Sequence, residues 1–145
     1  MKSVNSMRVS FPSKSVNESL GRSVVAAFAA MADPTVAELC DIRTAVSEAV
    51  TNCIVHGYRD GAGTVYITAA LYPDGQLAIR IRDTGCGIED VEKAMQPLFT
   101  TAPEQERAGL GFAVMQELCD RVRVISTPGK GTTVVLVKKL GKNGE

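Results

Sequence analysis

The spacing of hydrophobic residues predicts two consecutive helices in the first third of the chain. The pattern Ser15-Val16-Asn17-Glu18 is a capping box, in which the Ser and Glu side chains bind free amides, and it begins a helix that runs to about Ala32. Asp33-Pro34 interrupts this helix. A second capping box at Thr35-Val36-Ala37-Glu38 begins a longer helix that ends at Gly57. Hydrophobic residues three to four apart form the core-facing side of the longer helix: Leu39, Ile42, Val46, Val50 and Cys53 or Ile54.

A period of two predicts strands in the rest of the chain and near its start. Residues 6–11 alternate weakly and predict an edge strand. Strands at 64–71 and 76–82 are joined by Tyr72-Pro73-Asp74-Gly75, a strong hairpin turn. Two more strands at 123–126 and 132–138 are joined across Pro128-Gly129-Lys130-Gly131. The chain is therefore expected to contain two antiparallel hairpins.

The segment between the hairpins is predicted to contain a short helix at 90–95, a loop at 97–107 and a helix at about 110–120. The resulting order is β-α-α-β-β-α-α-β-β. It predicts an α/β (α+β) two-layer sandwich with helices on one face of a mixed, mostly antiparallel sheet. The sequence shows no repeat and no linker, so we expect a single domain over 1–145 with an ordered core at about 7–139.

Composition narrows the classes of function. Sixteen basic and sixteen acidic residues cancel, which makes direct nucleic-acid binding a poor expectation. Four scattered cysteines and one histidine do not form a metal-binding pattern, and they indicate a reduced compartment. The longest apolar run is too short to span a bilayer, and no secretory segment follows Met1. A cytoplasmic protein without membrane contact is expected.

Three polar residues four apart mark the end of the long predicted helix. Glu48, Asn52 and His56 share one face, which in isolation is more often simply solvated. Here hydrophobic residues surround the stripe, so little of this helix end is free to face water. The Asn52 carbonyl oxygen is a ligand that suits Mg²⁺. A single histidine favours a hydrogen-bonded structural role for His56.

Glycine-rich segments follow at three other places. Asp83-Thr84-Gly85-Cys86-Gly87 ends a strand, and its glycines let the backbone approach a flat ligand. Gly109-Leu110-Gly111 is predicted to open a helix, where free amides and the helix dipole favour a phosphate. Gly131-Thr132 places a hydroxyl at the start of the last strand. Each pattern alone is weak, since a tight turn, a flexible loop or a strand start would explain it.

Taken in order, these segments resemble the N box, the Asp-x-Gly-x-Gly box, the second glycine box and the Gly-Thr box of the GHKL (Bergerat-fold) ATPases. Longer phrases are similar to the bacterial anti-sigma serine kinases, in particular to those that control a sporulation sigma factor of the sigma-F type. The likeness runs from about Met7 to Lys139. The phrases that carry it are Ser47 to Asn52, His56-Gly57-Tyr58, Gln96 to Thr101 and Gly109 to Phe112.

The resemblance implies a role for each matching residue. Glu48 would be the general base that takes the serine proton, and Asn52 would coordinate the Mg²⁺ of bound ATP. Asp83 would bind adenine N6, with Gly85, Gly87 and Thr132 completing the adenine contacts. Arg107 would reach the γ-phosphate. The remaining nucleotide contacts would come from a lid formed by Thr100, Thr101, Gly109, Leu110 and Gly111.

The resemblance also implies partners. The family sequesters a sigma factor when bound to ATP, phosphorylates a serine of a small anti-anti-sigma protein of the STAS type, and forms homodimers. Arg22 matches a position implicated in partner contact, although a solvated charge would also explain it. The apolar side of the first helix, with Phe28 and Met31, exceeds what a small core needs. Ala102 and Ala108 stand where relatives often carry Lys and Ser, so turnover is expected to be slower.

Three alternatives remain open at this point. The first is an ATP-dependent sigma-binding module without phosphotransfer, against which the presence of Glu48 argues. The second is a paralogous kinase that serves a stress-response sigma factor. The third is the ATPase end of a histidine kinase, which the missing phosphoacceptor helix before the N box disfavours.

Overall fold

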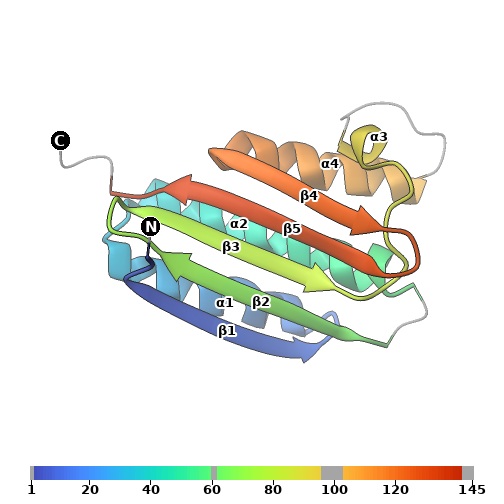
Figure 1. Ribbon diagram of the computed structural model, residues 1–145, viewed down its shortest axis with the longest axis horizontal. Helices are drawn as coiled ribbons and strands as arrows, with labels where there is room; N and C mark the ends of the chain where they lie inside the picture. The colour runs from blue at the N-terminus through green and yellow to red at the C-terminus, as the bar shows by residue number, and fades with distance from the viewer. Residues whose placement is uncertain (1, 60–61, 96–102, 142–145) are drawn as a thin grey trace.

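The chain folds into two layers, a sheet and a set of helices packed on one of its faces (Figure 1). The computed structural model describes residues 2–59, 62–95 and 103–141, with the backbone alone for 103–109. Helices α1, α2 and α4 lie behind the sheet in Figure 1, and the other face of the sheet is open. The predicted two-layer sandwich is confirmed. No helix within the described ranges is long and apolar enough to cross a membrane.

The sheet has five strands in the order β1-β2-β3-β5-β4, and all neighbours are antiparallel. Both predicted hairpins are present. Gly75 adopts a φ of 89° in the first hairpin turn, as a tight turn there requires. The strands are β1 (Asn5–Pro12), β2 (Thr64–Leu71), β3 (Gln76–Asp83), β4 (Arg121–Thr127) and β5 (Gly131–Lys139).

The first two helices follow the predicted pattern with one correction. Helix α1 spans Asn17–Ala29 and continues as a 3₁₀ turn at Ala30–Ala32, and α2 spans Val36–Asn52. The predicted capping box of α2 is complete. The Glu38 amide donates to the Thr35 hydroxyl, and the Thr35 amide donates to the Glu38 carboxylate. Burial raises the pKa of the Glu38 carboxyl, but hydrogen bonds from Thr35 and Gly141 outweigh it and the net pKa is lowered.

The capping box predicted at Ser15 was wrong. Val16 is the N-cap of α1, without a side-chain hydrogen bond. The Glu18 carboxylate instead accepts hydrogen bonds from the Arg22 guanidinium, at 2.9 Å, and from the Ser47 hydroxyl on α2. These partners take the place of the backbone amide that a capping box would require, and Glu18 therefore joins α1 to α2.

The helix predicted to begin near residue 110 begins seven residues earlier. Helix α4 spans Pro103–Leu118, after the short α3 (Val91–Met95). Pro is favoured in the first turn of a helix and Glu104 suits the positive end of the helix dipole, although hydrophobic periodicity is missing there. The part of the predicted loop at 97–102 lies outside the described residues.

The core lies between the helices and the covered face of the sheet. Phe112 and Met115 of α4 are fully buried, as are Ile42, Val46 and Val50 of α2. From the sheet, the core receives alternate residues, among them Val65, Ile67, Leu77, Ile81 and Leu136.

Phe28 and Met31, which the sequence marked as excess apolar surface, differ in how far their side chains are exposed. Phe28 is 5% exposed and belongs to the core, so its presence does not indicate spare apolar surface. Met31 is 57% exposed.

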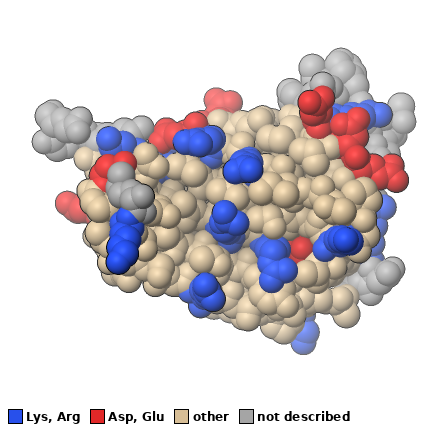
Figure 2. Space-filling view, in the orientation of Figure 1, with Lys and Arg blue, Asp and Glu red and all other residues tan. Residues whose placement is uncertain are grey.

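The open face of the sheet, shown in Figure 2, carries mainly Lys and Arg among its charged residues.

Candidate functional site

The predicted polar stripe lines a cavity at the end of α2. The α-helical pattern ends at Asn52 and is followed by a π-helical turn at Cys53–Gly57, a widened turn often found at functional sites. The cavity measures about 250 Å³. Its lining comprises Glu48, Thr51, Asn52, Val55, His56 and Leu110. The structure thus brings the stripe together with the glycine segment of α4, as the sequence predicted.

Gly111 brings the backbone of α4 close to the stripe. A methyl group on Gly111 would lie 3.2 Å from Glu48 Oε1 and 3.4 Å from Asn52 Nδ2. Glycine therefore leaves the Glu48 and Asn52 side chains room at the cavity wall. The predicted position at a helix start was wrong, because Gly109 and Gly111 lie within α4. Amides at that depth bond to carbonyls four residues earlier, so the helix dipole argument for phosphate does not hold in this conformation.

Asn52 has a free donor inside the protein. Its Nδ2 atom is buried and has no hydrogen-bond partner among the residues that the structure describes. A buried amide without a partner costs free energy, and such a group marks a place where a ligand supplies the missing contact. Its location at the cavity wall, beside the Glu48 carboxylate, fits a polar ligand there.

Asp83 is a charged residue that the fold buries. It ends β3, is 4% exposed, and its Oδ1 accepts a hydrogen bond from the Gly85 amide at 2.9 Å. A methyl group on Gly57 would lie 2.8 Å from the Asp83 carboxyl carbon, so the π-helical turn after α2 packs directly on this carboxylate. Burial raises the pKa of Asp83, and hydrogen bonds from Gly85, Cys53 and Thr132 partly offset that rise.

The glycines of the Asp83 turn are required by close backbone contacts. A methyl group on Gly85 would overlap the Gly57 carbonyl oxygen, to which the Cys86 amide donates a hydrogen bond at 2.9 Å. Gly87 has a φ of 75° and packs on the Thr127 carbonyl. The turn is thereby held between the end of α2 and the β4–β5 hairpin.

Thr132 lies opposite Asp83 in the pairing of β5 with β3, which confirms that these two segments meet. Its hydroxyl is 2.8 Å from the Ser126 hydroxyl, which also accepts the Ile88 amide at 2.8 Å. Ser126 was not among the predicted site residues. Its role in holding the turn depends on strand pairing, which the local sequence does not reveal.

Tyr58 is another residue that sequence reasoning missed. Its hydroxyl donates to the Thr64 carbonyl at 2.6 Å and accepts the Thr84 amide at 2.7 Å. The tyrosine therefore ties the residue after Asp83 to β2. Its signals were its position directly after the helix-ending glycine and its place in the family phrase His56-Gly57-Tyr58. Neither signal indicated these hydrogen bonds, because an aromatic residue there has many structural explanations.

Replacing Gly85 with Ala is expected to lower both thermal stability and nucleotide binding. The new methyl group would meet backbone, which cannot rotate away as a side chain does. A melting curve and a nucleotide titration would measure both effects. Gly129→Ala is the matched control, because no atom lies within 4 Å of a methyl group there, although its φ of 78° carries a cost of its own. A Gly85→Ala protein that binds nucleotide like the parent would contradict the assignment of the Asp83 turn to the nucleotide site.

The structure describes only some of the remaining predicted residues. Arg22 lies on α1, with its guanidinium 3.4 Å from the Ser47 hydroxyl, next to Glu48 in sequence. The backbones of Arg107 and Gly109 lie in α4. Thr100 and Thr101 lie outside the described residues.

The comparisons with known proteins agree with this geometry, and they first define the class of protein. Residues 11–138 match the model of the family described as histidine kinase-like ATPase domain. Solved structures share the fold. The RsbU and RsbW domains of a Mycobacterium tuberculosis protein superpose with a TM-score of 0.69 at 22% identity, covering 94% of this chain and 32% of that one. A blue-light activated histidine kinase of Erythrobacter litoralis superposes with a TM-score of 0.59 at 26% identity, covering 77% and 33%.

Curated relatives narrow the class. The anti-sigma F factor of Caldanaerobacter subterraneus is 58% identical over 139 residues, which cover 96% of both chains. That of Thermoanaerobacter sp. is 56% identical over 143 residues, covering 99% of both. That of Geobacillus kaustophilus is 48% identical, covering 96% of this chain and 95% of the relative. This chain belongs to the anti-sigma F factor family of histidine kinase-like ATPases, which confirms the resemblance found in its sequence.

Proposed function

We propose that this protein is an ATP- and Mg²⁺-dependent anti-sigma factor that is also a protein serine kinase. The observation that carries the proposal is that one cavity of a histidine kinase-like ATPase domain holds both the Glu48 carboxylate and Asn52. The buried Asn52 Nδ2 atom has no partner among the described residues. A carboxylate and an amide oxygen beside each other suit phosphoryl transfer, which needs a base and a way to neutralise phosphate charge.

The chemistry proposed at this cavity is an in-line displacement. The serine oxygen of a partner attacks the γ-phosphorus, the bond to ADP breaks, and Glu48 accepts the serine proton. Asn52 fits the site in two ways: its free Nδ2 donor can bind a phosphate oxygen, and its amide oxygen is a hard ligand that suits Mg²⁺. Bound Mg²⁺ would supply charge neutralisation at the phosphates.

Adenine is assigned to the turn after β3. The buried Asp83 carboxylate would accept a hydrogen bond from the exocyclic amine, with Gly85, Gly87 and Thr132 around the base. The Gly85 amide donates to the Asp83 carboxylate, and the Thr84 amide donates to the Tyr58 hydroxyl. Both bonds support the assignment, since they hold in place the turn that follows the carboxylate. Thr100, Thr101, Arg107, Gly109, Leu110 and Gly111 stay proposed as contacts to the phosphates. For the two glycines this requires the first turns of α4 to open, because their amides are otherwise bonded within the helix.

The proposed partners follow from the relatives named anti-sigma F factors. A sigma factor of the sigma-F type would be sequestered, a STAS-type anti-anti-sigma protein would be the kinase substrate, and two copies of the chain would form a homodimer in the cytoplasm. The exposed Met31 and Leu20 on the α1 side support a protein contact there.

The proposal is tested by mixing the protein with labelled ATP, Mg²⁺ and an anti-anti-sigma protein. Label on a serine of that protein is expected. ATP binding without any label on the partner would leave the second candidate, a sigma-binding module without phosphotransfer. Sigma pull-downs with a sporulation and a stress-response sigma factor separate the proposed function from its paralogue.

Arg22→Glu is expected to weaken sigma binding about tenfold or more without changing ATP affinity. The reversal puts a negative charge beside Glu18, and it removes a guanidinium whose side chain is 35% exposed near the cavity helix. Titrations of sigma and of ATP measure the two effects. Arg43→Glu, on α2, is the control for charge alone. Equal sigma affinity in the Arg22→Glu protein would retire the proposed contact.

A further inference from the structure

The open face of the sheet has a charge pattern that the nucleotide site does not use. The helix-facing positions of each strand are in the core, so the alternate positions point outward. Among these outward positions of the described strands there is no Asp or Glu, in a protein whose total charges balance. The outward basic residues, all exposed, are Arg8, Arg80, Arg82, Arg121, Arg123 and Lys139. In Figure 2 the blue side chains lie over the strands, and most red ones lie at the margin.

Three of these arginines form one row across the strands. Arg8 pairs with Thr68, Thr68 with Arg80, Arg80 with Val135, and Val135 with Arg123. The row therefore carries an arginine on β1, β3 and β4, with one strand between each pair. Strands lie about 4.8 Å apart, so successive arginines are about 10 Å apart.

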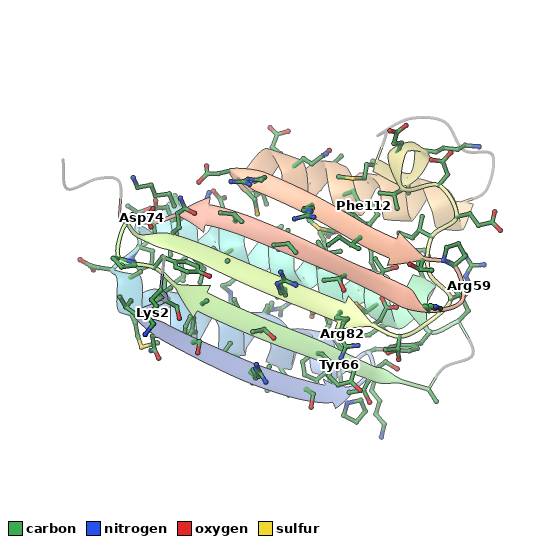
Figure 3. The ribbon with its side chains drawn as sticks, in the orientation of Figure 1. Lys2, Arg59, Tyr66, Asp74, Arg82 and Phe112 are labelled. Atoms are coloured by element: carbon green, nitrogen blue, oxygen red, sulfur yellow. The ribbon has the colours of Figure 1, made fainter. Side chains whose placement is uncertain are left out.

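A groove runs along the same part of the face. It measures about 670 Å³ and is lined by residues of β1, β2, β3 and β5, including Arg8, Tyr66, Arg80 and Arg82. The Arg82 guanidinium lies over the Tyr66 ring, 4.2 Å from its centre, and both residues are labelled in Figure 3. Tyr66 is the only aromatic residue among the outward positions of the described strands, and Arg82 occupies one side of its ring.

The arginines of the row are available for a partner. The two ion pairs recorded among the described residues join Arg22 to Glu18 and Lys138 to Asp41, and both lie on the helical side of the sheet. Arginine binds carboxylates through two parallel hydrogen bonds, and it is enriched in protein interfaces where lysine is depleted. A symmetric contact between two such faces would bring like charges together, which disfavours a second copy as the occupant.

We propose that this face docks an acidic helix of a partner protein, lying across the strands along the row of Arg8, Arg80 and Arg123. A helix rises 1.5 Å per residue, so carboxylates seven residues apart are about 10 Å apart and match the row. Single-stranded nucleic acid fits less well, because its bases need several stacking rings. The outward positions of the described strands offer one ring, Tyr66, on which Arg82 already stacks.

The test uses a synthetic helix of about 20 residues, rich in Ala, with Glu at i, i+7 and i+14. A control peptide has the same composition with its three Glu adjacent. Binding to the full, nucleotide-free chain is measured by fluorescence anisotropy at low and high salt. The omission of nucleotide keeps the result separate from the proposed kinase function.

The spaced peptide is expected to bind more tightly than the clustered one, and salt should weaken its binding. The double variant Arg80→Gln, Arg123→Gln should reduce affinity about tenfold, since both are exposed side chains whose loss leaves the core intact. Arg43→Gln, on the helical layer, should bind like the parent.

Four results would overturn the proposal. They are no binding of the spaced peptide, equal affinity for both peptides, an affinity of the double variant equal to that of the parent, or tighter binding of a single-stranded oligonucleotide of matched charge.

Discussion

Replacing Glu48 with Gln is expected to slow phosphotransfer by about 10²–10⁴-fold while ATP binding stays near that of the parent. The amide has the same shape and preserves the contact with Gly111, but it cannot accept the serine proton. A single-turnover assay with labelled ATP and an anti-anti-sigma protein measures the chemical step, and an ATP titration measures binding. The two measurements together distinguish a base from a binding residue.

The control for this variant is Glu117→Gln, an exposed carboxylate on the last turns of α4. It changes the net charge equally and should transfer phosphate at the parent rate. Normal turnover in the Glu48→Gln protein would remove Glu48 as the base. A loss of ATP binding in proportion to the loss of rate would instead make it a binding residue.

Asn52→Ala is expected to reduce Mg-ATP affinity by at least about 10–100-fold, because the loss of a residue that only supports a metal ligand already costs that much. Calorimetric titration with ATP in Mg²⁺ and in a chelator separates the metal-dependent part of the affinity. Asn52→Asp, which keeps an oxygen at the same place, should retain the dependence on Mg²⁺. Unchanged Mg-ATP affinity in the Asn52→Ala protein would contradict the ligand role.

The same variant is expected to keep its thermal stability without ligand. Removing a buried donor that has no partner among the described residues releases a desolvation cost, which offsets the lost packing. A melting temperature near that of the parent, combined with lost affinity, would show that Asn52 serves the ligand. Gln116→Ala, an exposed amide on α4, should change neither quantity.

Local patterns in the chain were sufficient for most of the secondary structure. Alternation over 64–71 and 76–82, with Pro-Asp-Gly between them, specifies a hairpin because both the strand pattern and the turn are short-range features. The start of α4 was missed because helix propensity and a first-turn Pro determine it, in a segment without hydrophobic periodicity. Ser15 failed as a cap because Glu18 found stronger partners on α1 and α2.

The candidate site also contains features that local spacing predicts and contacts that it does not. Spacing along one helix was enough to place Glu48 beside Asn52, since residues four apart share a helix face. The contact of Gly57 with Asp83 joins the π-helical turn after α2 to the end of β3, and no local pattern predicts it. Tyr58 and Ser126 hold the same turn through partners 26 and 38 residues away in sequence.

By itself, then, the sequence determined the alternation of helices and strands, the family, and the residues of the N box and the Asp83 turn. These properties depend on neighbours within a few residues, or on motifs in a recognisable order. The tertiary structure alone decided that Asp83 is buried against Gly57 and that Arg8, Arg80 and Arg123 form one row. A balanced net charge conceals such a row, because strand order, which long-range pairing determines, brings the three arginines to one face.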